Sequence, residues 1–463
     1  MSVRVFITGS CSPALGNWEQ QLGNAAILIG LLEALHALRT DVDVYTKYQL
    51  SAEFCSRHGI RSVSVDPRMY RTWFKRRVVT LHNIAASWLW GVVRKTTGID
   101  VRSLRAGPLL EALYSADVIV DVSGDTYGDN IGIRHFLNHS IEILIASAFG
   151  RPMLNLANSP GPFSGRLKRA IARRTLNRFA LVATREPLSA DGLRRIGVRS
   201  PLFTTACPAF LLRSAPEDRV DEILRAEGIS RGPQPLIGLT LAGYNLYANP
   251  TWNTPAQSED LEVYRPLMRF LVDDLEAHVV LIPHVYRMNP WTGQRIHGPD
   301  YATLRLLRDM TVRQAGDGRL TLLEGTYSPQ EVKGLLGKLA LHISGRLHAG
   351  VGALSQNVPT VLLSYGHKHT GFAMMLRQEK RVWQGSQGAE ALVDIVKEAW
   401  QNREAIEGEL AEAVPQVLSR ARANAEIILD TAAAGHASEE EVRATVERWQ
   451  ARSWEAQDTS AVP

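Results

Sequence analysis

Residues 339–372 contain two short apolar runs, and each run ends in a group of cationic side chains. The first run, Leu339 to Ile343, has the length and composition of a buried strand. Small and apolar residues from Ala349 to Ser355 predict a helix, and Val361 to Leu363 predicts a second strand. This order is typical of a parallel α/β sheet, in which ligands bind beyond the carboxyl ends of the strands.

Arginine, histidine and lysine side chains follow both predicted strands. Arg346 and His348 come after the first, and His367, Lys368 and His369 come after the second. A helix N-terminus at the same edge adds N–H groups and a positive partial charge. We therefore expect these five side chains to face one anion, a phosphate or a carboxylate. The alternative is a buried arginine paired with a structural carboxylate, but the stretch itself contains no Asp or Glu, which favours the anion site.

Strands and helices alternate in both halves of the chain. A strand from Val3 to Thr8 leads through a glycine-bearing turn into a helix from Ala25 to Leu38, without the G-x-G-x-x-G fingerprint of dinucleotide binding. The pattern restarts with a strand from Leu236 to Thr240. Because 463 residues are too many for one core, we predict an α/β fold with two facing Rossmann-like domains. The predicted parts are an N-terminal domain at 1–212 on the acceptor side, a C-terminal domain at 233–400 on the donor side, and a helical extension with a disordered tail at 401–463.

Residues 61–105 form a predicted insertion of different composition in the first domain. Basic residues alternate there with tryptophans, and the apolar run Val78 to Val93 is closed by Arg94 and Lys95. Such a pattern is typical of an amphipathic helix at a membrane surface. The alternative is a packed helical insertion whose basic side chains are simply solvated. Equal membrane binding of wild type and a charge-reversed variant would favour that alternative.

Composition narrows the function further. A net charge of +5 and a pI near 9.1 suit an anionic substrate or a negatively charged membrane surface, and no nucleic-acid motif is present. Three widely spaced cysteines predict neither a disulfide framework nor a zinc site, and we expect no metal. No signal-peptide pattern and no run of about twenty apolar residues occur. We therefore expect a cytoplasmic protein, with peripheral association to the inner face of the membrane as a hypothesis.

Polar candidates also follow other predicted strands. Asp125 follows the apolar run Ala116 to Val122, and a carboxylate at a strand end serves either as a general base or as a helix cap. We choose Asp125 as the candidate base. Arg185, His284 and Tyr244 stand at three further strand ends. For His284, a satisfied core histidine is the alternative to a role in binding.

Together these motifs resemble the polysaccharide pyruvyl transferase family, specifically the colanic-acid type. The resemblance spans about residues 3 to 385, and one departure is Asn24, which stands where the family usually has an aspartate. The residues that carry it are Ser344-Gly345-Arg346-Leu347-His348-Ala349, Val358-Pro359 and Ser364-Tyr365-Gly366-His367-Lys368, with weaker support from Val120 to Asp125, Ser159 to Phe163, Thr184 to Ser189 and Ile282 to His284.

The resemblance implies a GT-B-like fold and the transfer of pyruvate from phosphoenolpyruvate to two sugar hydroxyls, which gives a cyclic ketal. It implies no cofactor; the partners are phosphoenolpyruvate as donor substrate and a saccharide acceptor, free or lipid-linked, in exopolysaccharide or cell-surface glycan biosynthesis. Phosphoenolpyruvate carries a phosphate and a carboxylate, and arginine binds both as a bidentate partner. We therefore expect Arg346 and Arg185 to converge across the cleft between the two domains.

Ketal formation requires a base for the attacking hydroxyl and an acid for the methylene carbon of the donor. We choose Asp125 as the base and His348 or His284 as the acid or the phosphate clamp. The catalytic candidates are thus Asp125, His348 and Arg346, and the substrate-binding candidates are Arg185, His284, Arg346, Leu347, His348, Lys368, Tyr365 and Tyr244.

Two other functions stay open at this point. One is a GT-B glycosyltransferase that uses a nucleotide sugar, although the sequence near Arg346 lacks the carboxylate that would grip a ribose. The other is a non-catalytic member of a polysaccharide assembly complex, against which the presence of Arg185, Arg346, His348 and Asp125 argues.

Overall fold

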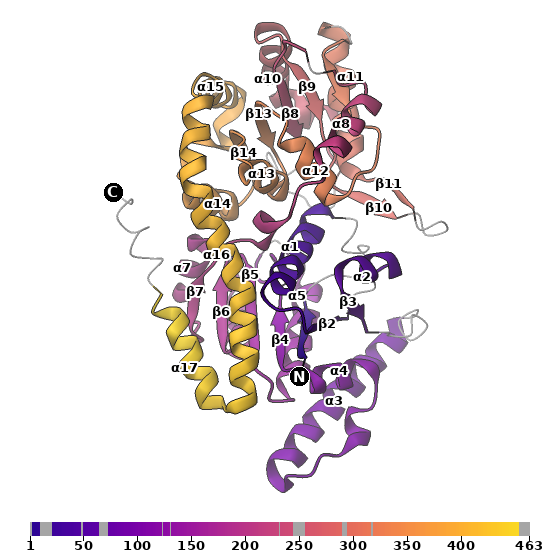
Figure 1. Cartoon of the computed structure of the whole chain (residues 1–463), viewed down its shortest axis with the longest axis vertical. Coiled ribbons are helices and arrows are strands. Elements are labelled where there is room, and N and C mark those ends of the chain that lie inside the picture. The colour runs from indigo at the N-terminus through magenta and orange to yellow at the C-terminus, as the bar shows by residue number, and fades with distance from the viewer. Residues whose placement is uncertain are drawn as a thin grey trace. The chain divides into compact units, whose positions relative to one another are not determined.

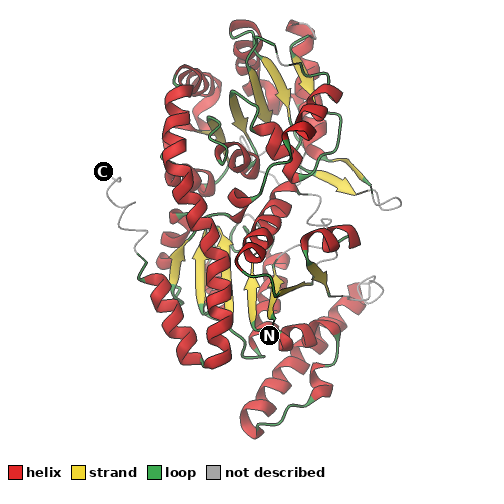
Figure 2. Ribbon diagram, in the orientation of Figure 1, coloured by secondary structure: helices red, strands yellow, loops and turns green. Residues whose placement is uncertain are grey.

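The computed structural model describes residues 2–9, 21–47, 50–63, 73–122, 124–129, 131–230, 232–243, 255–288, 294–315 and 318–452. The chain divides into two compact units, which are coloured along the sequence in Figure 1. Unit 1 comprises Met1–Asn17, Leu31–Cys207 and Arg420–Pro463, and unit 2 comprises Trp18–Gly30 and Pro208–Ser419. In each unit, helices flank a sheet, as Figure 2 shows.

The sheet of unit 1 is parallel and has the strand order β3-β2-β1-β4-β5-β6-β7. Every position of β4, β5 and β6 is buried, as expected for parallel strands covered on both faces. The order reverses between β1 and β4, which is the switch point of a Rossmann-like fold. The strands are β1 (Val3–Thr8), β2 (Val42–Thr46), β3 (Ile60–Ser62), β4 (Val118–Asp121), β5 (Met153–Asn158), β6 (Leu181–Thr184) and β7 (Leu202–Thr204).

Helices of unit 1 pack against this sheet through a core that includes Phe6, Ile119 and Phe136. The helix α1 begins in unit 2 and continues into unit 1, because the division falls after Gly30. The helices are α1 (Leu22–Leu38), α2 (Ala52–His58), α3 (Trp73–Thr97), α4 (Pro108–Ser115), α5 (Ile133–Ser147), α6 (Arg166–Leu176), α7 (Pro187–Arg195) and α17 (Glu439–Gln450).

The main sheet of unit 2 repeats the design, with the parallel order β12-β9-β8-β13-β14-β15 and the switch point between β8 and β13. Its strands are β8 (Leu236–Thr240), β9 (His278–Leu281), β12 (Leu320–Leu322), β13 (Leu341–Ser344), β14 (Thr360–Ser364) and β15 (Val382–Gln384); β10 (Tyr286–Met288) and β11 (Arg295–His297) form an antiparallel pair. Its helices are α8 (Glu217–Ala226), α9 (Ser258–Leu261), α10 (Arg265–Arg269), α11 (Pro299–Ala315), α12 (Pro329–Leu336), α13 (Leu347–Leu354), α14 (His367–Met375) and α15 (Gly388–Gln401). The helix α16 (Arg403–Ala437) begins in unit 2 and continues into unit 1, because the division falls after Ser419.

The predicted α/β fold with two Rossmann-like parts and a helical C-terminal region is confirmed, with some local differences. One is that α16 continues through Pro415, although a proline inside a helix usually interrupts it. Proline removes only one backbone donor, and buried neighbours such as Val414 and Val417 hold the helix in place. The division also differs from the boundaries 1–212, 233–400 and 401–463, since residues 18–30 belong to unit 2 and residues 420–463 to unit 1.

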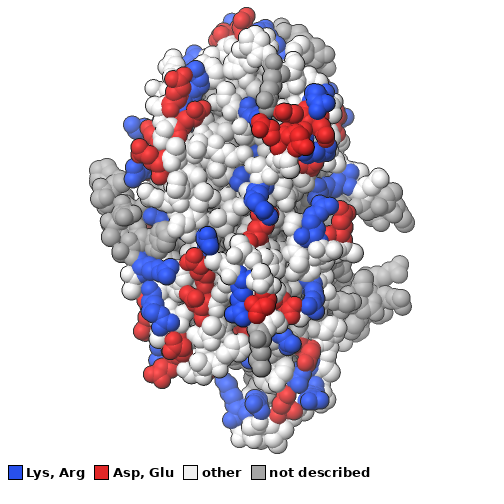
Figure 3. All heavy atoms as spheres, in the orientation of Figure 1, with Lys and Arg blue, Asp and Glu red and all other residues white. Residues whose placement is uncertain are grey.

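Lys and Arg side chains alternate with Asp and Glu over the face shown in Figure 3, rather than forming one large basic field. Among the described helices, none is both long enough and apolar enough to cross a membrane.

Candidate functional site

The carboxyl ends of β8, β9, β13 and β14 lie along one edge of the unit 2 sheet. Because these strands are parallel, the residues that follow them share this edge. Gly243 follows β8, His284 follows β9, Arg346 follows β13 and Tyr365 follows β14. The fold thus brings together predicted site residues from separate segments, at the switch point where Rossmann-like sheets bind ligands.

Arg346 is held by a buried carboxylate. Its Nε donates to Asp300 Oδ2 at 3.0 Å, and its Nη2 donates to Asp300 Oδ1. The Asp300 side chain is fully buried, whereas 16% of the Arg346 side chain is exposed. The absence of Asp and Glu from residues 339–372 did not exclude a structural partner, because the carboxylate that binds Arg346 comes from the start of α11. An arginine in a fixed orientation still presents a planar, positively charged group at the strand edge.

Asp300 joins three of the strand ends. Besides holding Arg346, its carboxylate accepts the N–H of Gly243 at 2.9 Å and the N–H of His284 at 3.3 Å. Gly243 has no room for a side chain, since a Cβ there would collide with Pro299. Sequence reasoning missed Asp300 because an aspartate after a proline is also an ordinary helix start.

The ring of His284 is buried, and neither of its nitrogens has a hydrogen-bond partner among the residues that the structure describes. Burial, the positive charge of Arg346 and the neighbouring His342 together lower the pKa of His284 to about 3. The ring is therefore neutral at pH 7 and offers one N–H donor and one acceptor nitrogen. Buried polar groups are rarely left without partners, so this histidine is suited to receive a polar ligand.

His348 lies in the first turn of α13, which begins two residues earlier than the sequence predicted. Its ring packs so closely on α1 that a Cβ at Gly23 would collide with it. The backbone N–H of Leu22 in turn donates to the carbonyl of His284 at 3.4 Å. A cavity of about 10 Å³, which is about the smallest volume that can hold one water molecule, lies beside both histidines. The neighbouring Leu347 is a buried apolar side chain.

Lys368 and Tyr365 follow β14 at the same edge. The Lys368 side chain is buried, and its Nζ lies 4.9 Å from the centroid of the Tyr365 ring. His369 Nδ1 donates to the carbonyl oxygen of Gly366 at 3.2 Å, and the His369 ring packs edge-on against Tyr365. A carbonyl oxygen only accepts, so His369 Nδ1 must carry the proton. His367 begins α14.

In unit 1, the sequence candidates Asp125 and Arg185 form an ion pair. Arg185 Nη2 donates to Asp125 Oδ1 at 2.6 Å, and Arg185 Nε donates to Ser159 Oγ at 2.8 Å. Asp125 follows β4, Ser159 follows β5 and Arg185 follows β6, so the three residues share one sheet edge. Burial alone would lower the pKa of Arg185, but Asp125 and Cys207 raise it above its ordinary value. The pair fixes the position of the Asp125 carboxylate.

A buried polar network lies next to this pair in the chain. Asp121 Oδ2 accepts from Tyr127 at 2.8 Å, from Asn155 at 2.9 Å and from His139 Nε2 at 3.1 Å. Burial alone would lower the pKa of His139, but Asp121 and Glu142 raise it to about 9. The charged His139 therefore stabilises the Asp121 carboxylate. His139 was missed, because one histidine in an amphipathic helix carries no distinctive signal.

The structure does not test every predicted site residue. Tyr244 lies outside the described residues. Arg185 and Arg346 belong to different units, so their convergence stays a prediction. Within the described ranges, no group of three or more His, Cys, Asp and Glu side chains is arranged to hold a metal ion.

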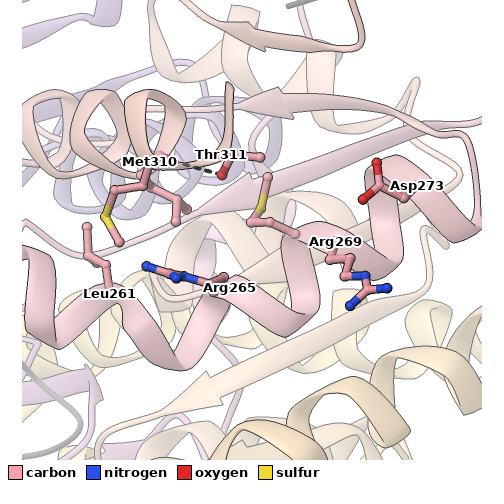
Figure 4. A pocket seen from close by; sticks show the side chains of 8 residues that line it. Leu261, Arg265, Arg269, Asp273, Met310 and Thr311 are labelled. Atoms are coloured by element: carbon pink, nitrogen blue, oxygen red, sulfur yellow. Dashed lines mark hydrogen bonds between the residues drawn. The ribbon is translucent and has the colours of Figure 1, made fainter. Parts of the chain in front are cut away.

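A larger pocket in unit 2, of about 270 Å³, lies away from the strand edge. Figure 4 shows it between α10 and α11, lined by Leu261, Arg265, Met268, Arg269, Asp273, Leu307, Met310 and Thr311. The α11 residues that line it are seven or more positions after Asp300, or about 10 Å or more along the helix. Arg265 there pairs with Glu262 at 2.6 Å. This pocket therefore does not include the candidate donor residues.

The two Rossmann-like units and the helical C-terminal region define a GT-B-like protein. S. aureus MnaA, in a structure with UDP, has a TM-score of 0.54 to this chain at 13% identity, covering 93% of this chain and 95% of that one. UDP-GlcNAc 2-epimerase from Neisseria meningitidis, bound to UDP-GlcNAc, has a TM-score of 0.52 at 11% identity, covering 93% and 100%. At such identities the likeness shows the fold alone.

Sequence comparison gives the family. Residues 22–367, more than half of the chain, match the polysaccharide pyruvyl transferase family, and the chain belongs to it. The amylovoran biosynthesis protein AmsJ of Erwinia amylovora is 22% identical over 370 residues, which cover 76% of this chain and 83% of that protein. The family predicted from the motifs is thereby confirmed.

Proposed function

We propose that this protein transfers pyruvate from phosphoenolpyruvate to two hydroxyls of a saccharide, forming a cyclic ketal in the biosynthesis of an exopolysaccharide or another cell-surface glycan. Family membership supports a pyruvyl transferase, and the similarity to AmsJ supports a role in polysaccharide biosynthesis. The observation that carries the donor assignment is the group of Arg346, His284, His348 and Lys368 at one sheet edge.

Phosphoenolpyruvate matches this group in charge and shape. Its phosphate and carboxylate both favour a planar guanidinium, and Asp300 holds that of Arg346 in one orientation. Lys368 adds a positive charge from a neighbouring strand end. The neutral His284 adds a hydrogen-bond donor in a buried setting, where such a bond is stronger than in water.

The proposed reaction requires a base and an acid. The methylene carbon of the donor takes up a proton, two sugar oxygens bond to the central carbon, and its bond to the phosphate oxygen breaks, releasing inorganic phosphate. Each sugar hydroxyl loses one proton; one proton is matched by the uptake at the methylene carbon, and the other leaves with the phosphate. We assign Asp125 as the base for a hydroxyl and His348 as the acid. The other candidate acid, His284, has a pKa of about 3, so its ring is neutral at pH 7 and lacks the additional proton that an acid donates.

Thermal unfolding with candidate donors tests the proposal. A ligand at about 100 times its Kd stabilises the folded state by about 2.7 kcal/mol, so phosphoenolpyruvate should raise the Tm while UDP- and GDP-sugars should not. Arg346→Lys keeps the charge beside Asp300 but loses the planar fork, and should lose most of this shift. Arg319→Lys is the matched control, because Arg319 lies 3.7 Å from Glu276 in another part of unit 2.

A phosphate-release assay completes the test. Phosphoenolpyruvate should release phosphate only in the presence of a suitable member of a panel of free and lipid-linked saccharides. Stabilisation by a nucleotide sugar instead of phosphoenolpyruvate would identify a glycosyltransferase. If neither ligand raises the Tm, and no saccharide of the panel leads to phosphate release from phosphoenolpyruvate, the protein is a non-catalytic member of an assembly complex.

A further inference from the structure

The helix α3 of unit 1 carries a continuous stripe of exposed apolar side chains. These residues, which we term the α3 stripe, are Val78, Leu81, Ala85, Trp88, Leu89 and Val92. They recur at intervals of three and four, so they share one face of the helix. Trp88 and Leu81 are 66% and 64% exposed, unusually high fractions for such large apolar groups.

The opposite face of α3 is fixed to the core of unit 1. Ala86 and Trp90 are buried there, and the Trp90 ring packs on Phe149 with a centroid distance of 5.1 Å. Trp90 Nε1 also donates to Asp100 Oδ1 at 2.9 Å. Because this face is already packed, α3 cannot turn its stripe inward without breaking these contacts. Figure 1 shows α3 reaching beyond the sheet of unit 1, next to α4.

The stretch of sequence that carries the stripe has charged residues of one sign only. From position 67 to 99 the chain contains no Asp or Glu. Arg77 and Lys95 are exposed and about five turns apart, so they stand along the same edge of the stripe. The cations of this segment are Arg68, Arg71, Lys75, Arg76, Arg77, Arg94 and Lys95.

We propose that the α3 stripe docks unit 1 on the surface of an anionic lipid bilayer, with the apolar side chains at the headgroup boundary and with Arg77 and Lys95 facing the lipid phosphates. An exposed tryptophan, a leucine-rich face and flanking cations are the features that hold a helix in this interface. A second copy of the chain is a poorer occupant, because two acid-free basic segments would repel one another.

Vesicle co-sedimentation of the full chain tests the proposal. The protein should bind vesicles of phosphatidylcholine with phosphatidylglycerol at low salt, and less at high salt or with phosphatidylcholine alone. Leu81→Ser with Trp88→Ser should weaken binding about ten-fold or more, because both lose apolar area. Leu167→Ser is the matched control: Leu167 is 65% exposed on the basic helix α6 and should leave binding unchanged.

Three results would overturn the proposal. The first is that the wild type does not bind anionic vesicles. The second is that the stripe variant and the Leu167→Ser control bind equally well. The third is a change of oligomeric mass in the stripe variant, which would make the stripe an interface between copies. The donor residues lie in unit 2, so phosphate release with a free saccharide should be unaffected in the stripe variant. Loss of vesicle binding is therefore distinguishable from failure of the proposed reaction.

Discussion

Replacing Asp300 with asparagine should release Arg346 and weaken the unit 2 site. The two oxygens of Asp300 together accept four N–H donors: two from Arg346, one from Gly243 and one from His284. Asparagine retains one acceptor oxygen, removes the negative charge and turns an N–H group toward other donors. Breaking a buried ion pair costs about 3–5 kcal/mol, and we take about 3 because Arg346 is partly exposed.

The expected shift follows from the size of the unit. For a body of roughly 150–250 residues, 1 kcal/mol changes the Tm by about 2–4 °C, so the unfolding transition of unit 2 should fall by about 6–12 °C. The Tm gain with phosphoenolpyruvate should be lost as well, since Arg346 is no longer oriented. Asp309→Asn is the control on the same helix, where an exposed pair with Arg308 at 3.3 Å contributes only about 0–1 kcal/mol.

Two results would contradict these expectations for Asp300. A variant that unfolds at the wild-type temperature would show that the Asp300 carboxylate does not stabilise unit 2. A variant with a lowered Tm but an intact phosphoenolpyruvate shift would make Asp300 purely structural, and donor binding would then not depend on the orientation of Arg346.

Two further predictions concern Asp125 and His284. Asp125→Asn should reduce turnover about 10²–10⁴-fold in the phosphate-release assay with little change in donor affinity, and a collapse of that affinity would make Asp125 a donor-binding or structural residue. His284 has a folded pKa of about 3 against an ordinary 6.5, so the unfolded chain takes up the proton first as pH falls. Wild type should therefore lose stability from about pH 6.5 down to 3, and His284→Asn should lose less; equal acid sensitivity in Tm measurements across this range would contradict the neutral, buried ring.

The alternation of strands and helices was readable from local patterns. The strand at Leu236–Thr240 has the predicted bounds, and the strand before Arg346 is displaced by only two residues at its start. Apolar runs and turn residues act within a few positions of one another, so they report local structure directly. The motif of Arg346, Leu347 and His348 likewise identified the family before any geometry was known.

Packing decided which side of a helix is buried and where a helix ends. Trp88 and Trp90 belong to the same apolar run, yet Trp88 is exposed and Trp90 is buried against Phe149. The run alone does not show which side meets the rest of the unit. Similarly, α16 continues through Pro415 because neighbouring side chains are buried, an influence that outweighs the local preference of proline.

By itself, the sequence determined which cations and carboxylates stand at strand ends, because strand ends are set by residues close in the chain. Only the tertiary structure decided how they pair. Arg346 meets Asp300 across 46 positions, and Arg185 meets Asp125 across 60. Those partners depend on the order in which strands join the sheet, and that order places residues from distant segments on one edge. An ion pair of this kind has no local periodicity, so it appears only when the sheets have formed.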